Sequence, residues 1–407
     1  MRWYGWVMVV VASLAMVATL PGRTHGLGMI TERLLTDPTL GLTRTAYGQM
    51  NLWATLLGSL FCLGMGTLID RHGIRLTLGS VMLALGCVVL AMTRLNSILF
   101  LFVAILLTRG LGQSALSVVS ITIVGKWFDR SVSLPMAVYS ILMAGGFIAA
   151  ALVGREYANV DWRLLWGVLG WAVVGLTIVL TCLARDRNQP WDTNIRSAVN
   201  KGRDSQSVDF THQQALSTAM FWVAAGGISL YGMIASGISL FNESILVDLG
   251  FRKEVYYESL AMGTAIGVFA KLAAGMLGIH VPLNRLLSVA LLLLAVSLAW
   301  LTQLSTYTDV VIYVGINAVS GGMLTVLFFS TWSQLYGQSY LGRIQGNAQM
   351  LTVIASAFGP LLFAQAREWS GSYHPLLWML AAVVLLNAAI AWFTSLPRHP
   401  STFGNST

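Results

Sequence analysis

Apolar segments long enough to span a bilayer follow one another along this chain, with only short polar connections between most of them. Hydrophobic residues make up 56% of the sequence and charged residues only 10%, whereas soluble globular proteins carry roughly 25% charged residues. A chain of 407 residues with so little charge cannot cover itself with a surface that suits water, so the lipid bilayer must be its solvent. At roughly 20 apolar residues per helix plus short loops, this length accommodates about twelve membrane-spanning helices.

One long polar stretch divides the apolar segments into two groups of six. We therefore predict an all-α integral membrane protein with twelve transmembrane helices in two pseudo-symmetric six-helix halves. The N-terminal half covers 1–184, a cytoplasmic linker covers 185–215, and the C-terminal half with a short cytoplasmic tail covers 216–407. Two equal halves are typical of carriers whose binding site lies at the interface between repeats. The expected spans are 4–31, 46–69, 76–93, 98–125, 133–155, 163–184, 216–245, 256–279, 285–304, 309–333, 345–366 and 373–395.

The distribution of Lys and Arg predicts how the chain is oriented in the membrane. With both termini in the cytoplasm, the cytoplasmic connections carry the excess of Lys and Arg over acids, and the outer connections do not. This orientation explains the net charge of +8, because no segment forms a basic stripe suited to nucleic acid. The first apolar run lacks the small-residue cleavage pattern of a signal peptide, so we interpret it as the first span. Short loops without large extramembrane domains favour the bacterial inner (plasma) membrane.

The connection after the second predicted span reads GTLIDRHGIR, from Gly66 to Arg75, and places charge and glycine between two apolar segments. Its glycines, Gly66 and Gly73, allow close helix approach and a tight turn. Its Asp70 and the two arginines, Arg71 and Arg75, can latch one helix end to a neighbour at the water interface. The pattern G-x-x-x-D-R-x-G-x-R resembles the signature loop between the second and third helices of the major facilitator superfamily. This resemblance implies the major facilitator fold and alternating-access transport, with these five residues as a gating motif.

Three basic residues remain inside predicted spans: Arg23, Arg109 and Lys271. A charge near the bilayer centre costs at least about 2.5–3.5 kcal/mol, so such side chains face a cavity, a partner or water rather than lipid. No acidic residue lies within two turns of Arg109 or Lys271 along their helices. Cations without acidic partners in a central cavity create a positive potential that suits an anionic substrate, most simply a carboxylate. We therefore predict that these three residues bind a small organic anion.

For each of these three cations, a structural role is the alternative to substrate binding. Arg109 lies in LTRGLGQSAL, which resembles a superfamily helix-4 motif whose Arg often has a structural or proton-linked role. Arg23 lies near the outer end of its helix, 19 residues after Tyr4, and its side chain can snorkel to the interface. Lys271 lies in the middle of its span, where snorkelling is hardest, so a functional role is favoured there.

Further side chains are candidates for proton coupling or substrate binding. A histidine in a wet cavity titrates near neutral pH, so His25 can carry a coupling proton, although a hydrogen-bonded interfacial histidine is the commoner case. Glu32 and Glu243 are rival proton sites, each near a membrane surface, where an acid can also be a solvated helix end. The polar positions that complete the predicted substrate site are Tyr139, Tyr231 and Asn317.

Three pairs of small residues interrupt predicted helices: Pro21-Gly22 in the first, Gly145-Gly146 in the fifth and Gly226-Gly227 in the seventh. Carriers bend between their states at broken or closely packed helices. Small residues at helix interfaces are also ordinary membrane packing.

A narrower resemblance is to the monocarboxylate and oxalate–formate porters of the same superfamily. It rests on WYGWVMVVVASLAM and LPGRTHG in the first span, on GKWFDRSVSLPMAVYSILMAGG, and on Lys271-x-x-x-Gly275. Lys271 stands at the position of their helix-8 Arg, which is implicated in binding the carboxylate. The first span lacks the Asp of the animal monocarboxylate carriers, and Gly267 replaces the acid one turn before the helix-8 Arg. The resemblance implies a monocarboxylate substrate, and the two departures bear on proton coupling (symport) rather than on the fold.

Other functional classes find little support in the sequence. No GxxxxGK[ST] loop occurs, so a proton or solute gradient, rather than ATP, would drive transport through this chain. Because the six histidines lack metal-ligand spacing on one helix and the three cysteines are scattered, we expect no metal, no cofactor and no enzymatic activity. The alternatives are an efflux carrier for amphipathic or drug-like molecules and, less favoured, a membrane-embedded sensor or enzyme. The expected partners are the substrate, protons and the lipid bilayer, with the chain acting as a monomer.

Overall fold

A computed structural model describes residues 2–35, 37, 42, 44–94, 97–128, 132–156, 161–186 and 209–397, most of them with their side chains. Every regular element in this part of the chain is a helix, and no strand occurs in it. The side chains of His25, Glu32 and Glu243, and most of the predicted linker, lie outside the described residues. Helices satisfy their own backbone hydrogen bonds, which is the condition that a bilayer imposes on apolar segments such as these.

The helices fall into two groups along the chain. The first group contains α1 (Arg2–Val17), the 3-10 turn η1 (Leu20–Gly22), α2 (Thr24–Gly28), α3 (Thr31–Leu35), α4 (Arg44–Ser59), α5 (Phe61–Met92), α6 (Ile98–Thr108), the π-helix η2 (Arg109–Leu116), α7 (Ser117–Trp127), α8 (Ser133–Glu156) and α9 (Trp162–Leu183). The second group contains α11 (His212–Leu216), α12 (Ala219–Asp248), α13 (Lys253–His280), α14 (Leu283–Leu301), α15 (Tyr307–Tyr336), α16 (Leu341–Ser370) and α17 (His374–Phe393).

Ten helical stretches in the described part of the chain are long and apolar enough to cross a membrane. One of them, Ala46–Met92, contains two crossings, because Gly73 (φ +81°) breaks the helical backbone inside α5. Gly73 lies against Asp186, just beyond the end of α9, whereas Met92 accepts a hydrogen bond from Trp166 near the start of α9. The chain therefore turns back at Gly73. Together with the shorter apolar helix Trp3–Val17, these stretches supply twelve crossings, which confirms the predicted fold.

The predicted interruptions of three helices are present in only one of them. Pro21-Gly22 belongs to the 3-10 turn η1 between α1 and α2, so the first span is broken as expected. Helices α8 and α12 continue without a break through Gly145-Gly146 and Gly226-Gly227. The prediction of interruptions there was wrong, because one glycine of each pair packs closely on a neighbouring helix within an intact α-helix.

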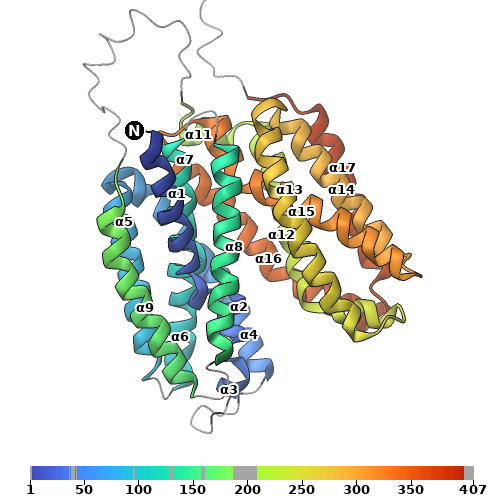
Figure 1. Cartoon of the computed structure of the whole chain (residues 1–407), viewed down its shortest axis with the longest axis horizontal. Coiled ribbons are helices and arrows are strands. Elements are labelled where there is room, and N and C mark those ends of the chain that lie inside the picture. Colours follow the sequence, from blue (N-terminus) through green and yellow to red (C-terminus); the bar gives the residue numbers. More distant parts are fainter. Residues whose placement is uncertain are drawn as a thin grey trace, which may run out of the picture.

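Buried apolar side chains form two clusters, one in each group of helices. The first cluster draws its buried members from residues 8–184 and adds only Phe329 from the second group. The second cluster draws its members from residues 210–391 and adds only Ala137 from the first group. Figure 1 shows the two bundles side by side, blue to green for the first and yellow to red for the second. Two separate cores allow each bundle to move as a body.

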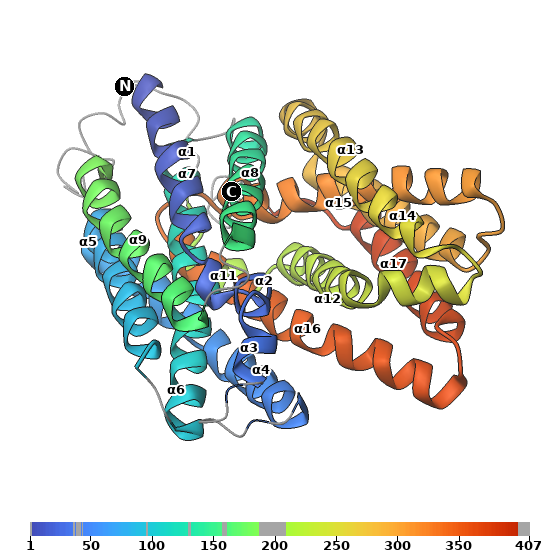
Figure 2. The same cartoon turned by 60° about the horizontal axis from the view of Figure 1, so that its bottom comes forward.

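One place where the two bundles meet is between α8 and α13, which lie next to each other in Figure 2. Where α8 begins, Ser133 and Ala137 pack against Gly275 and Gly278 of α13. About three turns earlier on the same face of α13, Gly267 has no neighbouring atom within 4 Å of its Cβ position. The bundles therefore touch at one end and separate away from it. We name the closed end the Asp70 end, after the ion pair described below.

Candidate functional site

The break in the first span places Arg23 beside Arg109. Gly22 in η1 packs so closely on the backbone of Thr108 that a side chain would not fit there. On the opposing helix, the Cβ position of Gly112 lies 3.2 Å from the Cα atom of Gly22. This contact brings the residue after the break, Arg23, against the start of η2, where Arg109 lies. Thr24, which directly follows Arg23, accepts a hydrogen bond from Arg109, so the two arginines lie on adjoining segments.

Arg109 is the first residue of the π-helix η2, a widened helical segment that the sequence did not predict. Such segments are rare and often occur at functional sites. The side chain is buried, and its Nη1 donates hydrogen bonds to Gln113 Oε1 over 2.7 Å and to Thr24 Oγ1 over 3.1 Å. Its Nη2 donates to Asn51 Oδ1 over 3.0 Å, while its Nε is buried without a hydrogen bond. Because all three partners are uncharged, the positive charge of Arg109 is not neutralised by them.

Arg23 is likewise bound by uncharged groups among the residues whose side chains are described. Its Nε donates to Thr19 Oγ1 over 2.7 Å, and its Nη2 donates to Ser117 Oγ over 3.0 Å and to the sulfur of Met16 over 2.8 Å. The guanidinium carbon lies 5.4 Å from the ring centroid of Phe147. Met16 and Ser117 are fully buried, so the guanidinium points into the first bundle and away from the membrane surface. Its Nη1 has no hydrogen-bond partner among the described residues.

Tyr139 connects Arg23 with the second bundle. Its side chain is fully buried, and its hydroxyl shares a 2.8 Å hydrogen bond with Ser120. Its ring packs edge-on against Phe329 of α15, with 5.1 Å between the ring centroids. Its hydroxyl also lies within electrostatic range of Arg23. Tyr139 therefore lies where the two bundles meet, within reach of the charge of Arg23.

The third predicted cation, Lys271, lies on α13 of the second bundle. Its backbone packs against Gly322 of α15, and the hydroxyl of Tyr231 lies against the same stretch of α15. The half-buried Lys271 makes no hydrogen bond or ion pair with any described residue. Asn317 bonds elsewhere, since its Oδ1 accepts a 3.4 Å hydrogen bond from Ser297 of α14. Lys271 and Tyr231 thus both pack against the Gly321-Gly322 stretch of α15, whereas Asn317 bonds to Ser297.

The three predicted proton-coupling residues lie on helices whose backbone is described. His25 belongs to α2, Glu32 to α3 and Glu243 to α12. Their side chains lie outside the described residues, so their coupling role stays a prediction.

At the closed end, Asp70 joins the two bundles. Its Oδ1 lies 3.1 Å from Nζ of Lys126 at the end of α7, and its Oδ2 lies 3.8 Å from Nε of Arg343 on α16. The side chain of Asp70 is only 7% exposed, so water screens these pairs weakly. One carboxylate therefore holds a cation of its own bundle and a cation of the other.

Glycines on both sides of this ion pair allow α5 and α16 to touch. A Cβ atom on Gly66 would lie 2.5 Å from Cα of Arg343 and 2.5 Å from the carbonyl oxygen of Gly342. One turn further along α16, a Cβ atom on Gly346 would lie 2.5 Å from the carbonyl oxygen of Cys62. Backbones that approach this closely tolerate only glycine at the crossing.

The remaining residues of the predicted gating motif take different positions. Gly73 adopts φ +81° at the turn, and the following amide, on Ile74, donates a 2.5 Å hydrogen bond to Asp186. Arg71 and Arg75 are exposed and form no hydrogen bond or ion pair with another described residue. Within the described part of the chain, the inter-bundle contact of this motif is made by Gly66 and Asp70.

The segment before α12, which includes Asp209 and His212, is bound to the second bundle at the Asp70 end. Asp209 accepts hydrogen bonds from the backbone amides of Ser339 over 2.9 Å and Gln338 over 3.3 Å. Nε2 of His212 lies 2.6 Å from the amide nitrogen of Asn347 on α16. Burial lowers the pKa of His212, the charge of Arg343 lowers it further, and the charge of Asp70 opposes both.

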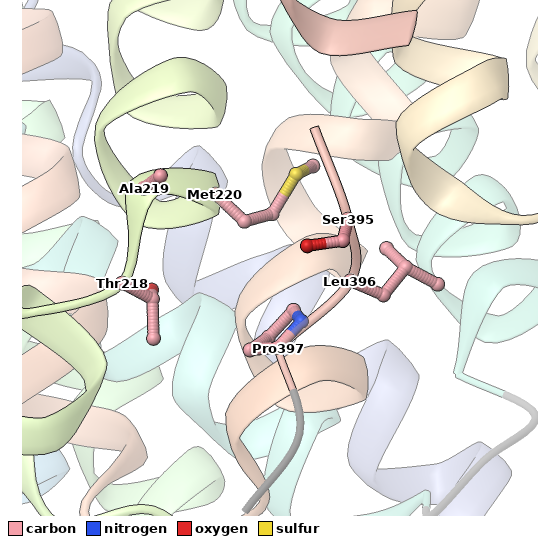
Figure 3. A pocket seen from close by; sticks show the side chains of 6 residues that line it. All are labelled: Thr218, Ala219, Met220, Ser395, Leu396 and Pro397. Atoms are coloured by element: carbon pink, nitrogen blue, oxygen red, sulfur yellow. The ribbon is translucent and has the colours of Figure 1, made fainter. Parts of the chain in front are cut away.

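A cavity of about 450 Å³ lies between the start of α12 and the segment after α17, as Figure 3 shows. None of its lining side chains is charged, and the hydroxyl of Thr218 is already bonded to Tyr336. It therefore lacks the cations that the predicted anionic substrate requires. The lining residues are Thr218, Ala219, Met220, Ser395, Leu396 and Pro397.

Sequence reasoning missed the neutral partners that hold the two arginines. Gln113 follows Arg109 at the i, i+4 spacing at which helical side chains meet, so the local sequence carried a signal for this pair. Asn51 and Thr24 lie 58 and 85 residues away in the chain, and no local pattern links them to Arg109. Ser117 lies at a comparable distance from Arg23.

Comparison with known proteins gives one family and several structural neighbours. The family model described as Major Facilitator Superfamily matches residues 3–360. No curated protein matches the sequence. The crystal structure of the human organic anion transporter MFSD10 (TETRAN) matches with a TM-score of 0.66 and 16% identity, over 95% of this chain and 98% of that one.

Two further solved structures share the fold. FucP, a Major Facilitator Superfamily transporter in the outward conformation, matches with a TM-score of 0.69 and 12% identity, over 97% of this chain and 100% of that one. The proton:xylose symporter XylE, bound to 6-bromo-6-deoxy-D-glucose, matches with a TM-score of 0.68 and 14% identity, over 97% of this chain and 96% of that one. At these identities the likeness concerns the fold alone.

Proposed function

The chain belongs to the major facilitator superfamily, and we propose that it is a secondary transporter for a small organic anion, most simply a monocarboxylate. Members of this superfamily are integral membrane proteins that move small molecules across the bilayer. The observation that carries the substrate proposal is the pair Arg109 and Arg23, whose bonding partners in the described part of the chain are all uncharged.

An embedded cation without a counter-ion is costly, and the cost falls when a ligand supplies the negative charge. The Arg23–Arg109 pair leaves several N–H donors without a partner among the described residues, and a guanidinium binds a carboxylate through two parallel hydrogen bonds. Lys271, in the second bundle, is a third cation without a partner among the described residues. An anion that contacts both bundles would couple its binding to their relative movement.

We propose that the Asp70 end faces the cytoplasm. The excess of Lys and Arg on the connections at this side supports the assignment. The bundles touch at this end and separate away from it, so the described conformation would be open to the outside. Transport would then require the Asp70–Arg343 contact to break while the other end closes.

The driving force that we propose is a gradient of protons or of the substrate itself. His25, Glu32 and Glu243 are the proposed proton sites. If a proton accompanies the anion, acid on the side of entry accelerates uptake, because the proton moves down the imposed pH gradient and carries the anion with it.

Uptake into proteoliposomes tests this function. We would measure uptake of labelled acetate, lactate, oxalate, succinate and benzoate, with and without an imposed pH gradient. The wild type should show saturable uptake of at least one of them, and Arg109→Gln should lower kcat/KM for that substrate at least tenfold. Arg367→Gln is the matched control, since Arg367 pairs with Asp248 at the surface and lies outside the proposed site.

Two results would reject the anion proposal. The first is no uptake of any carboxylate in the panel, together with uptake of amphipathic cations, which would favour the efflux alternative. The second is uptake that neither Arg109→Gln nor Lys271→Gln alters.

A further inference from the structure

Some of the hydrogen-bond donors of Arg109 are used by described side chains, and the others have no partner among them. A guanidinium carries five N–H donors, and three of these are used by Gln113, Thr24 and Asn51. Among the described residues, Nε and the second N–H of Nη2 have no partner, and Nε is buried without a hydrogen bond. Arg109 is thus held in place, yet the described residues neither use all of its donors nor neutralise its charge.

Two of the partners are amides at positions where a carboxylate would fit. Asn51 and Gln113 present side-chain oxygens to Arg109 at 3.0 Å and 2.7 Å, the distances that an Asp or Glu oxygen would also take. A carboxylate at either position would form a charge-assisted bond with Arg109 and supply the missing negative charge from within the protein.

We propose that Asn51 and Gln113 determine the charge selectivity of the site: they position Arg109 without neutralising it, so that the substrate must bring the negative charge. This inference rests on the proposed anion transport. It identifies two neutral residues as the reason why the cation stays available, although neither residue needs to touch the substrate.

The surroundings of Asn51 explain why an amide suits this position. Its Nδ2 donates a 3.1 Å hydrogen bond to the carbonyl oxygen of Tyr47, one turn earlier on α4, while its Oδ1 accepts from Arg109. The amide nitrogen therefore bonds to its own helix, and the amide oxygen bonds to the arginine. Aspartate would lose the bond to Tyr47 and place two oxygens against each other.

Gln113 offers the cleaner test. Its amide nitrogen makes no hydrogen bond to a described residue, so Gln113→Glu removes no contact that the structure shows and changes mainly the charge beside Arg109. Gln113→Leu, of similar size, removes the acceptor without adding charge. The two variants separate neutralisation of Arg109 from simple loss of a hydrogen bond.

The experiment measures KM and kcat for the carboxylate of the panel that the wild type transports best. Gln113→Glu should raise KM at least tenfold, whereas Gln113→Leu should raise it less than threefold. Asn51→Asp, on a different helix, is the second charge variant and should also raise KM at least tenfold. Size-exclusion profiles and thermal unfolding midpoints identify which variants are folded.

The outcomes distinguish this inference from the proposed function. If the wild type transports no carboxylate, the proposed function is wrong and the inference falls with it. If the wild type transports a carboxylate and the folded charge variants keep its KM, only the inference is overturned. Equal losses in Gln113→Glu and Gln113→Leu would also overturn it, because a positioning role alone would then explain both.

Discussion

The carboxylate of Asp70 lies between two cations from different bundles, 3.1 Å from Nζ of Lys126 and 3.8 Å from Nε of Arg343. Lys126 shares its bundle with Asp70, whereas Arg343 lies across the interface. Directly beside this pair, Gly66 and Gly342 bring the backbones of α5 and α16 into contact. An ion pair and a close glycine crossing thus close the same end of the molecule. Alternating access would have to separate both.

Asp70→Asn should loosen the closed end. The variant keeps the shape of the side chain but removes the charge that holds Arg343, so we expect a larger population open at the Asp70 end. Native Cys62 reports on this change, because it is fully buried beside Gly346. In a Cys87→Ser/Cys182→Ser background, labelling of Cys62 by a water-soluble maleimide should become at least threefold faster. Arg71→Gln, at an exposed residue without a described partner, should leave the rate unchanged. Unchanged labelling in Asp70→Asn would contradict the proposal that the Asp70–Arg343 ion pair keeps this end closed.

Gly66→Ala should separate α5 from α16. The added methyl group would lie 2.5 Å from the backbone of Arg343, and backbone atoms cannot move aside as a flexible side chain can. We expect faster labelling of Cys62 and slower carboxylate uptake. Gly64→Ala is the matched control, since its Cβ position has no neighbour within 4 Å. If the two variants behaved alike, the crossing at Gly66 would not close this end.

Acidification should weaken the attachment of α11 to α16. The pKa of His212 in the folded protein is lowered, by burial first and by the charge of Arg343 second, so the fold favours the neutral imidazole. The resulting stability is present above the ordinary pKa of about 6.5 and is lost as the pH falls through the lowered folded value. We expect the unfolding midpoint of the wild type to fall more between pH 7.5 and pH 5 than that of His212→Gln, measured by thermal shift in detergent. An equal fall of the unfolding midpoint in the two proteins would show that protonation of His212 does not affect stability.

Asp209→Ala should destabilise the second bundle. The carboxylate accepts hydrogen bonds from two backbone amides, on Gln338 and Ser339, at the turn where Gly337 adopts φ +81°. Hydrogen bonds to a charged group contribute about 1.5–3 kcal/mol each, less where water competes, so we expect a loss of about 1–3 kcal/mol. A denaturant titration in detergent measures this change in the free energy of unfolding. Asp209→Asn should retain part of the lost stability, and a stability of Asp209→Ala equal to the wild type would contradict the anchor.

The sequence alone predicted the twelve crossings because each apolar run must form a helix in lipid, independently of its neighbours. It also predicted the turn at Gly73, since glycine and charge interrupt apolar periodicity, whereas Asp70, expected in the same turn, lies in the helical part of α5. The partner of Asp70 across the interface, Arg343, could not be predicted, because it depends on how the two bundles pack. Most of the hydrogen-bond partners of Arg109 could not be predicted either, for the same reason. Only Gln113, one turn away on the same helix, was within reach of a local pattern.

The expected helix breaks show the opposite error. Gly145-Gly146 and Gly226-Gly227 predict interruptions, yet α8 and α12 continue through them. Glycine lowers helix propensity but does not end a helix whose backbone bonds have no competitor in lipid. Pro21 differs because it lacks the backbone N–H, and the chain forms a 3-10 turn there.

Isothermal titration of the purified protein with its best transported carboxylate tests most directly whether the embedded arginine binds the anion. We expect one site per chain in the wild type and a Kd at least tenfold weaker in Arg109→Gln, a difference of about 1.4 kcal/mol or more. Arg367→Gln should bind like the wild type. Equal affinity in Arg109→Gln and the wild type would contradict the proposal that Arg109 recognises the substrate's negative charge.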